Sequence, residues 1–173
     1  DADKPGAYTW NKAPRLAGQV LETGALARQL AQGQPLLRAL WQRSRGNVFT
    51  RVLARAMELA QLVLLAQDCL RAIVPGAPCC EEAHLPEAAD AVGLCEAARG
   101  SLGHWLSIRG GRIASYQIVA PTGWNFSPRD HAGTPGALEA ALVGAPVLAG
   151  ETSPVAVQHI VRAFDPCMVC TVH

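Results

Sequence analysis

The fold is decided by residues 47–74, NVFTRVLARAMELAQLVLLAQDCLRAIV. Apolar side chains such as Val52 and Leu59 recur in this stretch every three to four residues, which is the period of an α-helix. Asn47 stands just before the run, and its side chain is suited to accept a hydrogen bond from the first turn of a helix. We therefore predict a long helix over residues 47–74. Its apolar face is wide, particularly at residues 62–66, so we expect several neighbouring elements to bury it.

Shorter helices and one hairpin are predicted around this segment. Periodicity and capping signals predict further helices over residues 18–32, 85–98, 135–142 and 153–164. The last of these has Ser153 as its predicted N-cap. Two strands, 104–108 and 112–119, flank Gly110 and Gly111, because glycines adopt the positive φ that a tight hairpin turn needs. The predicted fold is mainly α, a helical bundle with a small antiparallel β-hairpin in a single domain.

Composition excludes several classes of protein. A chain of 173 residues is long enough to bury a core. Lys and Arg number 15 and Asp and Glu 14, so no strong field attracts nucleic acid. Apolar residues make up 50% of the chain and charged residues 17%, which predicts that part of the surface is covered by something else. The sequence contains neither a membrane-spanning run nor a signal peptide, so we expect a cytoplasmic location or association with the cytoplasmic membrane through partners.

The six cysteines are predicted to be thiols, because a chain of this size does not need disulfides and their spacing matches no small secreted framework. Cys167 and Cys170 form a Cys-x-x-Cys pair, which places two soft thiolates within reach of one metal. Zinc sites, iron-sulfur sites and redox dithiols share this spacing, although a zinc ribbon would need a second pair. The remaining cysteines are expected to be buried packing residues: Cys69, Cys79, Cys80 and Cys95.

Three further residues have side chains suited to a metal or anion site. His173 ends the chain, and its imidazole and terminal carboxylate either ligate a metal or form a solvated terminus. Arg99 offers a fork of donors to an anionic or cyanide-like acceptor, and Gly100 beside it allows close approach of a backbone. The alternative for Arg99 is a cation at the end of a helix. Asp165, two residues before Cys167, either orients Arg99 or ends a helix.

Four blocks of the sequence, in order along nearly the whole chain, resemble the large subunits of nickel-iron hydrogenases. These blocks are YTWNKAPRL with GQVLETGALAR (8–28), EAARGSLGHW (96–105), PTGWNFSPRD (121–130) and DPCMVCTVH (165–173). The last two are the most specific. Residues 1–173 are therefore identified as similar to the C-terminal portion of such a subunit. The resemblance implies an enzyme subunit that heterolytically cleaves or forms dihydrogen at a Ni-Fe(CN)2(CO) centre.

The resemblance also implies a role for each site residue. Cys167 would be a terminal nickel ligand and the first acceptor of the proton, and Cys170 would bridge nickel to the iron that carries carbon monoxide and cyanide. Arg99 would donate to a cyanide and take part in polarising the substrate or handling its proton. Asp165 would pair with Arg99 over the open site. Thr122 would supply its hydroxyl to a cyanide.

Further ligands and partners are implied in the same way. His173 and the backbone carbonyl near Ile118 would bind magnesium. Electrons would pass to a small subunit, which alone holds iron-sulfur clusters. The segment with the family's other Cys-x-x-Cys pair is absent, so we expect the remaining N-terminal part of the large subunit to bring the other nickel ligands. One departure is Ala98, where the family usually has proline before the Arg-Gly pair.

Two alternatives remain open from the sequence. The first is a hydrogen-sensing regulatory subunit that signals to a kinase partner. Catalytic large subunits are usually cut after the terminal histidine, so a chain that ends at His173 fits either a processed enzyme or a sensor that never had the extension. The second is a metal-free structural relative in a quinone-reductase complex. The presence of Cys167, Cys170 and His173 argues against that relative.

Overall fold

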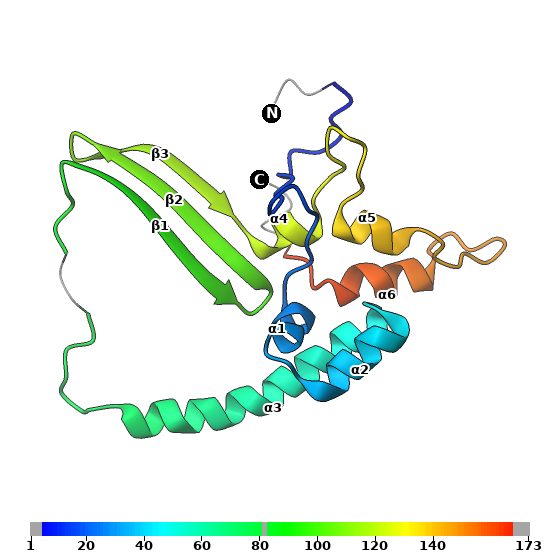
Figure 1. The fold of residues 1–173 in the computed structure, drawn as a ribbon, viewed down its shortest axis with the longest axis horizontal. Helices are drawn as coiled ribbons and strands as arrows, with labels where there is room; N and C mark the ends of the chain where they lie inside the picture. Colours follow the sequence, from blue (N-terminus) through cyan, green and yellow to red (C-terminus); the bar gives the residue numbers. More distant parts are fainter. Residues whose placement is uncertain (1–4, 81–82, 168–173) are drawn as a thin grey trace.

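The computed structural model describes residues 5–80 and 83–167 of the chain. Within them the elements, in chain order, are α1 (Ala25–Ala31), α2 (Pro35–Ser44), α3 (Val48–Ala72), β1 (Ala88–Ala97), β2 (Gly100–Arg109), β3 (Arg112–Val119), α4 (Pro121–Asn125), α5 (Ala137–Leu142) and α6 (Val155–Ala163). The sheet projects from one side of the group of helices, and α3 runs along the lower edge of the view (Figure 1). The predicted mainly α bundle is therefore confirmed only in part, because the sheet is larger than a hairpin.

Helix α3 confirms the prediction made for residues 47–74, and a reciprocal pair of hydrogen bonds, a capping box, closes its N-terminus. The Asn47 side chain accepts a hydrogen bond from the Thr50 backbone N–H (3.1 Å), and the Thr50 hydroxyl accepts one from the Asn47 N–H (2.9 Å). One face of the N-terminal half of α3 is buried, at Thr50, Arg51 and Ala54, and Ala54 is fully inaccessible to solvent. We expected neighbouring elements to bury residues 62–66. Within the described residues they do not, since the large side chains at 62–65 are more than half exposed.

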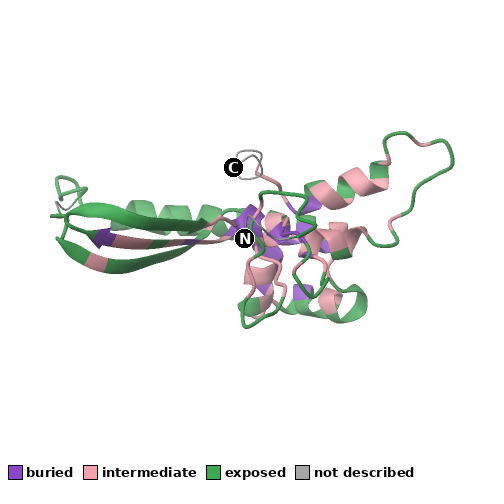
Figure 2. Cartoon of the chain, turned by 90° about the horizontal axis from the view of Figure 1, so that it is seen from above, coloured by how far each residue is buried: buried purple, intermediate pink, exposed green. Residues whose placement is uncertain are grey.

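The hydrophobic core lies where α1, α2 and α3 meet. Leu26, Leu37 and Ala54 form its buried centre, and partly buried side chains from the same helices surround them. The helix predicted over residues 18–32 begins only at Ala25, because Gly24 has a φ of 124° that is incompatible with a helix. Buried residues gather in this central region, and most of the sheet and the far half of α3 are exposed (Figure 2).

The helix predicted over residues 85–98 is wrong. Residues 88–97 instead form β1, which pairs antiparallel with β2 along its whole length, from Ala88 opposite Arg109 to Ala97 opposite Gly100. Alanine and leucine favour a helix locally, but hydrogen bonding to the adjacent strand overrides this weak preference. The predicted β2–β3 hairpin is confirmed.

The last two helices lie close to their predicted ranges. The Ser153 cap is not found. Instead, the Glu151 carboxylate accepts a hydrogen bond from the Val155 N–H at the start of α6 (2.8 Å). The expectation of buried packing cysteines is also wrong, since Cys69, Cys79, Cys80 and Cys95 are all exposed. No helix within the described residues is long and apolar enough to span a bilayer.

Candidate functional site

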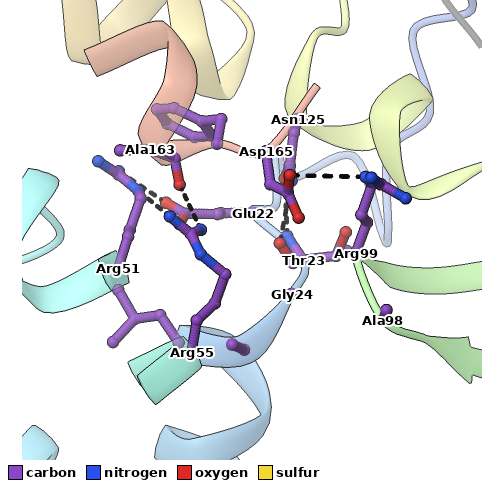
Figure 3. A pocket seen from close by; sticks show the side chains of 13 residues that line it. Glu22, Thr23, Gly24, Arg51, Arg55, Ala98, Arg99, Asn125, Ala163 and Asp165 are labelled. Carbon is purple, nitrogen blue, oxygen red and sulfur yellow. Dashed lines mark hydrogen bonds and ion pairs between the residues drawn. The ribbon is translucent and has the colours of Figure 1, made fainter. Parts of the chain in front are cut away.

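Segments from distant parts of the sequence meet beside the core and enclose a small polar cavity of about 20 Å³. This is room for about one water molecule. Its walls come from residues 22–26 ahead of and within α1, two arginines of α3, the turn between β1 and β2, Asn125 of α4, and residues 163–165 at the end of α6 (Figure 3). The cavity therefore lies at the junction of all four sequence blocks that resemble the hydrogenase family.

Arg99 and Asp165, which lie 66 positions apart in the sequence numbering, face each other at the rim of this cavity. Arg99 Nε is 3.6 Å from Asp165 Oδ1, and the two side chains are 47% and 41% exposed. Arg99 stands in the two-residue turn between β1 and β2, so it is not a cation at the end of a helix. Asp165 has a positive φ of 53°, which turns the chain sharply after α6. Both side chains remain open on one side to a ligand or to another part of the protein.

Cys167 is held beside this pair by Thr122. The Cys167 backbone N–H donates a hydrogen bond to Thr122 Oγ1 (3.2 Å). Thr122 is 2% exposed, and it lies in α4, which begins with Pro121 at its first position. Because the Thr122 oxygen acts as an acceptor in this bond, its own proton is still available for donation to another group. The structure thus brings Thr122, Asp165 and Cys167 together with Arg99.

The backbone just ahead of Asp165 is fixed by two arginines of α3. The Arg55 guanidinium donates to the Ala163 carbonyl (2.8 Å) at the end of α6. The Arg51 guanidinium lies over the ring of Phe164, 3.9 Å from the ring centroid, and makes a two-point ion pair with Glu22 (2.7 and 2.9 Å). A cation over an aromatic face is attracted by the ring, and the attraction is strongest away from water. Arg51 is only 6% exposed.

The loop of residues 22–24 joins these parts. The Asn125 side-chain amide accepts from the Thr23 N–H (2.9 Å) and donates to the Thr23 carbonyl (3.0 Å). Thr23 and Gly24 also press against the β1–β2 turn, since a Cβ placed on Gly100 would lie 2.4 Å from Thr23 Oγ1. Within the described residues, Thr23 Oγ1 is a buried side-chain oxygen that makes no hydrogen bond. The loop therefore links α4 to the strand turn that carries Arg99.

The sequence prediction did not single out Glu22, Arg51, Arg55 or Asn125. Two signals point to them. Glu22 and Asn125 lie inside the blocks that resemble the family. Arg51, Arg55 and the following Glu58 are spaced at i, i+4 and i+7, so these charged side chains share one face of an otherwise apolar helix.

The PTGWNFSPRD block packs against the YTWNKAPRL block. The Arg15 guanidinium donates to Ser127 Oγ (3.2 Å) and the Pro128 carbonyl (3.2 Å), and it pairs with Asp130 (3.4 Å). A backbone hydrogen bond from Thr134 and the Arg15 guanidinium lower the pKa of the Asp130 carboxyl. The Asp130 carboxylate thus pairs with Arg15, and it also accepts a hydrogen bond from the Thr134 N–H (2.9 Å), which caps the turn.

The two proposed metal sites differ in how much of them the described residues contain. Cys170 and His173 lie outside the described residues. Cys167 is half-buried, its thiol is a soft donor, and it lies two residues beyond the carboxylate that pairs with the Arg99 guanidinium; this donor set fits a nickel-iron centre with anionic ligands. The Ile118 carbonyl accepts a hydrogen bond from the Lys12 ammonium (2.8 Å). No group of three metal-binding side chains occurs among the described residues, so the magnesium site stays a prediction.

Comparison with known proteins identifies the family of the chain. The whole chain, residues 1–173, matches the family described as nickel-dependent hydrogenase. It is 38% identical to the periplasmic [NiFeSe] hydrogenase large subunit of Desulfomicrobium baculatum over 188 residues, which cover 99% of this chain and 36% of that protein. It is 34% identical to the uptake hydrogenase large subunit of Rhodobacter capsulatus over 194 residues, which cover 99% of this chain and 32% of that protein.

Solved structures give the same result for the fold. The chain superposes on the D. baculatum [NiFeSe] hydrogenase with a TM-score of 0.85 and 39% identity, covering 99% of this chain and 38% of that one. For the Ni-Fe-Se hydrogenase of D. vulgaris Hildenborough the TM-score is 0.84 at 37% identity, with 99% and 39% covered. The chain thus spans less than two fifths of the length of these relatives. On its sequence, fold and site, this chain belongs to the nickel-dependent hydrogenase family.

Proposed function

We propose that this chain forms part of the active-site subunit of a nickel-iron hydrogenase, which heterolytically cleaves or forms dihydrogen. The observation that carries this proposal is the convergence of Arg99, Asp165 and Cys167, with Thr122 holding the cysteine backbone. A soft thiol two residues beyond the carboxylate that pairs with a guanidinium is a suitable setting for a thiolate-bound metal with anionic ligands. When bound, the Ni-Fe(CN)2(CO) centre supplies the Lewis acidity and the open position that dihydrogen needs.

Each residue then has a distinct task. Cys167 would hold nickel through Sγ, and the same sulfur would accept the proton released when dihydrogen is split. The Arg99 guanidinium would donate to a cyanide of the iron. Asp165 holds the Arg99 guanidinium in one orientation through the 3.6 Å ion pair. Thr122 fixes the Cys167 backbone and has its hydroxyl proton available for a cyanide.

The complete site requires residues that this structure does not describe. Cys170 is the proposed bridging ligand of nickel and iron, and His173 with the Ile118 carbonyl is the proposed magnesium site. Because the chain spans 36% of the D. baculatum subunit, we propose that the remaining part of the large subunit brings the other nickel ligands. The relatives are large subunits by name, which supports an iron-sulfur small subunit as the partner that takes the electrons.

The rival functions have less support. The named relatives are uptake and periplasmic hydrogenases, which favours turnover of dihydrogen over sensing with a kinase partner. A metal-free quinone-reductase subunit would not need a cysteine at position 167. Location also stays a prediction, because the D. baculatum relative is periplasmic by name, whereas the sequence suggested the cytoplasm or its membrane.

The test is Cys167→Ser in the assembled protein, with the exposed Cys69→Ser as the matched control. A serine oxygen is a harder, more weakly bound ligand than a thiolate, so we expect nickel content and dihydrogen activity both to fall by more than about tenfold. Metal analysis and dihydrogen uptake would measure the two effects. If Cys167→Ser kept both at the level of Cys69→Ser, the proposed function would be wrong.

A further inference from the structure

The Arg28 side chain of α1 contacts two carboxylates and two backbone carbonyls. Its Nε and Nη2 atoms form a two-point ion pair with Glu58 of α3 (2.8 and 2.7 Å), and Nη1 pairs with Glu96 of β1 (2.9 Å). The same guanidinium donates to two consecutive backbone carbonyls, those of Ala97 (2.9 Å) and Ala98 (3.0 Å). The side chain is 18% exposed, so water competes little for these bonds.

The two carbonyls are the last ones before Arg99. Ala98 and Arg99 alone connect β1 to β2, because Ala97 pairs directly with Gly100. A turn this short has little freedom once its first carbonyls are held. Gly24 closes the opposite side, since a Cβ built on it would lie 3.2 Å from the Arg99 carbonyl oxygen. The backbone of Arg99 is therefore enclosed between Arg28 and the 22–24 loop.

We propose that Arg28 is a positioning residue, which fixes the backbone of Arg99 so that its guanidinium meets Asp165 at the candidate site. The proposal rests on the proposed function and concerns how one residue of that site is oriented. Arg28 does not itself line the small cavity, so it acts through Arg99. Glu58 serves as the fixed anchor on α3, because it holds two of the three donor nitrogens of Arg28.

Arginine is required for this task by its shape. The planar guanidinium directs its N–H groups outward in a fixed fork, so one side chain can serve two carboxylates and two carbonyls together. The hydrogen bonds that Arg28 donates to the Glu58 carboxylate raise the pKa of Arg28 above its already high usual value, so the charge is permanent. Lysine keeps the charge but concentrates it at one nitrogen, which cannot reach all four acceptors in one plane.

The same strand pair provides a matched control at its far end. Arg109 pairs with Asp90 through two contacts of 3.0 Å and donates to the Ala89 carbonyl of β1 (3.1 Å). These contacts are of the same kind as those of Arg28, but they lie at the opposite end of the hairpin from Arg99. If Arg28 merely fastens the sheet, losing either arginine should have similar effects on the site.

The experiment compares Arg28→Lys with Arg109→Gln in the assembled protein. We expect Arg28→Lys to keep its nickel and to lose about 10- to 100-fold in kcat, the cost of a misplaced catalytic group. Infrared bands of the cyanide ligands should shift as they do in Arg99→Lys, and amide hydrogen exchange at residues 98–100 should rise about tenfold or more. Arg109→Gln should leave the kcat, bands and exchange at those residues unchanged.

A double variant separates positioning from general stability. In an Arg99→Lys background, Arg28→Lys should change kcat by less than about twofold, because residues that act together are not additive. The proposal is overturned if the two losses multiply, if Arg28→Lys matches the parent protein, or if Arg28→Lys fails to load nickel. A parent protein without nickel or dihydrogen activity would instead refute the proposed function, and the positioning role with it.

Discussion

Replacing Gly100 with alanine tests how tightly the turn that carries Arg99 is packed. Gly100 has a φ of 133°, a backbone angle that residues other than glycine rarely adopt. A Cβ there would lie 2.4 Å from Thr23 Oγ1 and 2.8 Å from the Gly24 backbone nitrogen. The backbone atom cannot be moved by a simple rotamer change. Gly100→Ala therefore combines backbone strain with a steric overlap.

The two costs can be estimated separately. A residue held in a sparsely populated region of φ and ψ costs about 1–3 kcal/mol. Overpacking a buried site costs a further 1–3 kcal/mol or so. The expected loss in the free energy of unfolding is therefore about 2–6 kcal/mol, which is a large share of the roughly 5–15 kcal/mol that stabilises a typical protein.

Thermal unfolding of the assembled protein would measure this loss, with Gly93→Ala as the control. Gly93 lies on β1 of the same hairpin, and a Cβ there would meet no atom within 4 Å. For a unit of this size each kcal/mol shifts the midpoint by about 2–4 °C, so Gly100→Ala should unfold at least roughly 4 °C below the control. Thr23→Ala should recover part of the loss. Midpoints within about 2 °C of each other for Gly100→Ala and Gly93→Ala would refute the packing argument.

Two further predictions concern helix ends. Asn47→Ala removes one half of the reciprocal cap of α3 and should cost about 1 kcal/mol in thermal unfolding; an unchanged midpoint would mean that the cap contributes no stability. At Glu151, hydrogen bonds from the Val155 and Leu148 N–H groups lower the carboxyl pKa below its ordinary value of 4.5. The folded pKa is depressed, so this stabilisation is present above pH 4.5 and is lost as the pH falls through the folded pKa. The unfolding midpoint of Glu151→Gln should accordingly fall less steeply on acidification than that of the parent protein, and identical pH profiles would contradict this.

The parts of the fold that the sequence predicted are those with local causes. Helix α3 has a regular apolar period and a cap at Asn47, and the β2–β3 turn has two adjacent glycines. Strand β1 was missed because its alanines favour a helix and its turn, Ala98 and Arg99, has no glycine inside it. Its strand conformation depends on pairing with β2, and this pairing cannot be predicted from the local sequence of residues 88–97.

The candidate site divides in the same way. Of the residues that the resemblance named within the described part, the structure brings together Arg99, Asp165, Thr122 and Cys167, whereas the Ile118 carbonyl accepts a hydrogen bond from Lys12. The surrounding residues that position this site contact one another across long distances in the sequence, and the sequence prediction missed them. Arg51 meets Glu22 from 29 positions away, and Arg28 meets Glu58 from 30 positions away. Such contacts depend on how α1 packs on α3, which a single sequence does not specify.

The two turns of the β1–β2–β3 sheet have opposite consequences for engineering the protein. An insertion beside Arg99 would move a residue that is enclosed on both sides. Gly110, at the other end of β2, has a φ of 59° and open space around it, with nothing within 4 Å of an added Cβ. Exposed turn tips of this kind tolerate inserted sequence. An affinity tag or a fluorescent label is therefore best introduced between Gly110 and Gly111, where it would report on the protein without touching the candidate site.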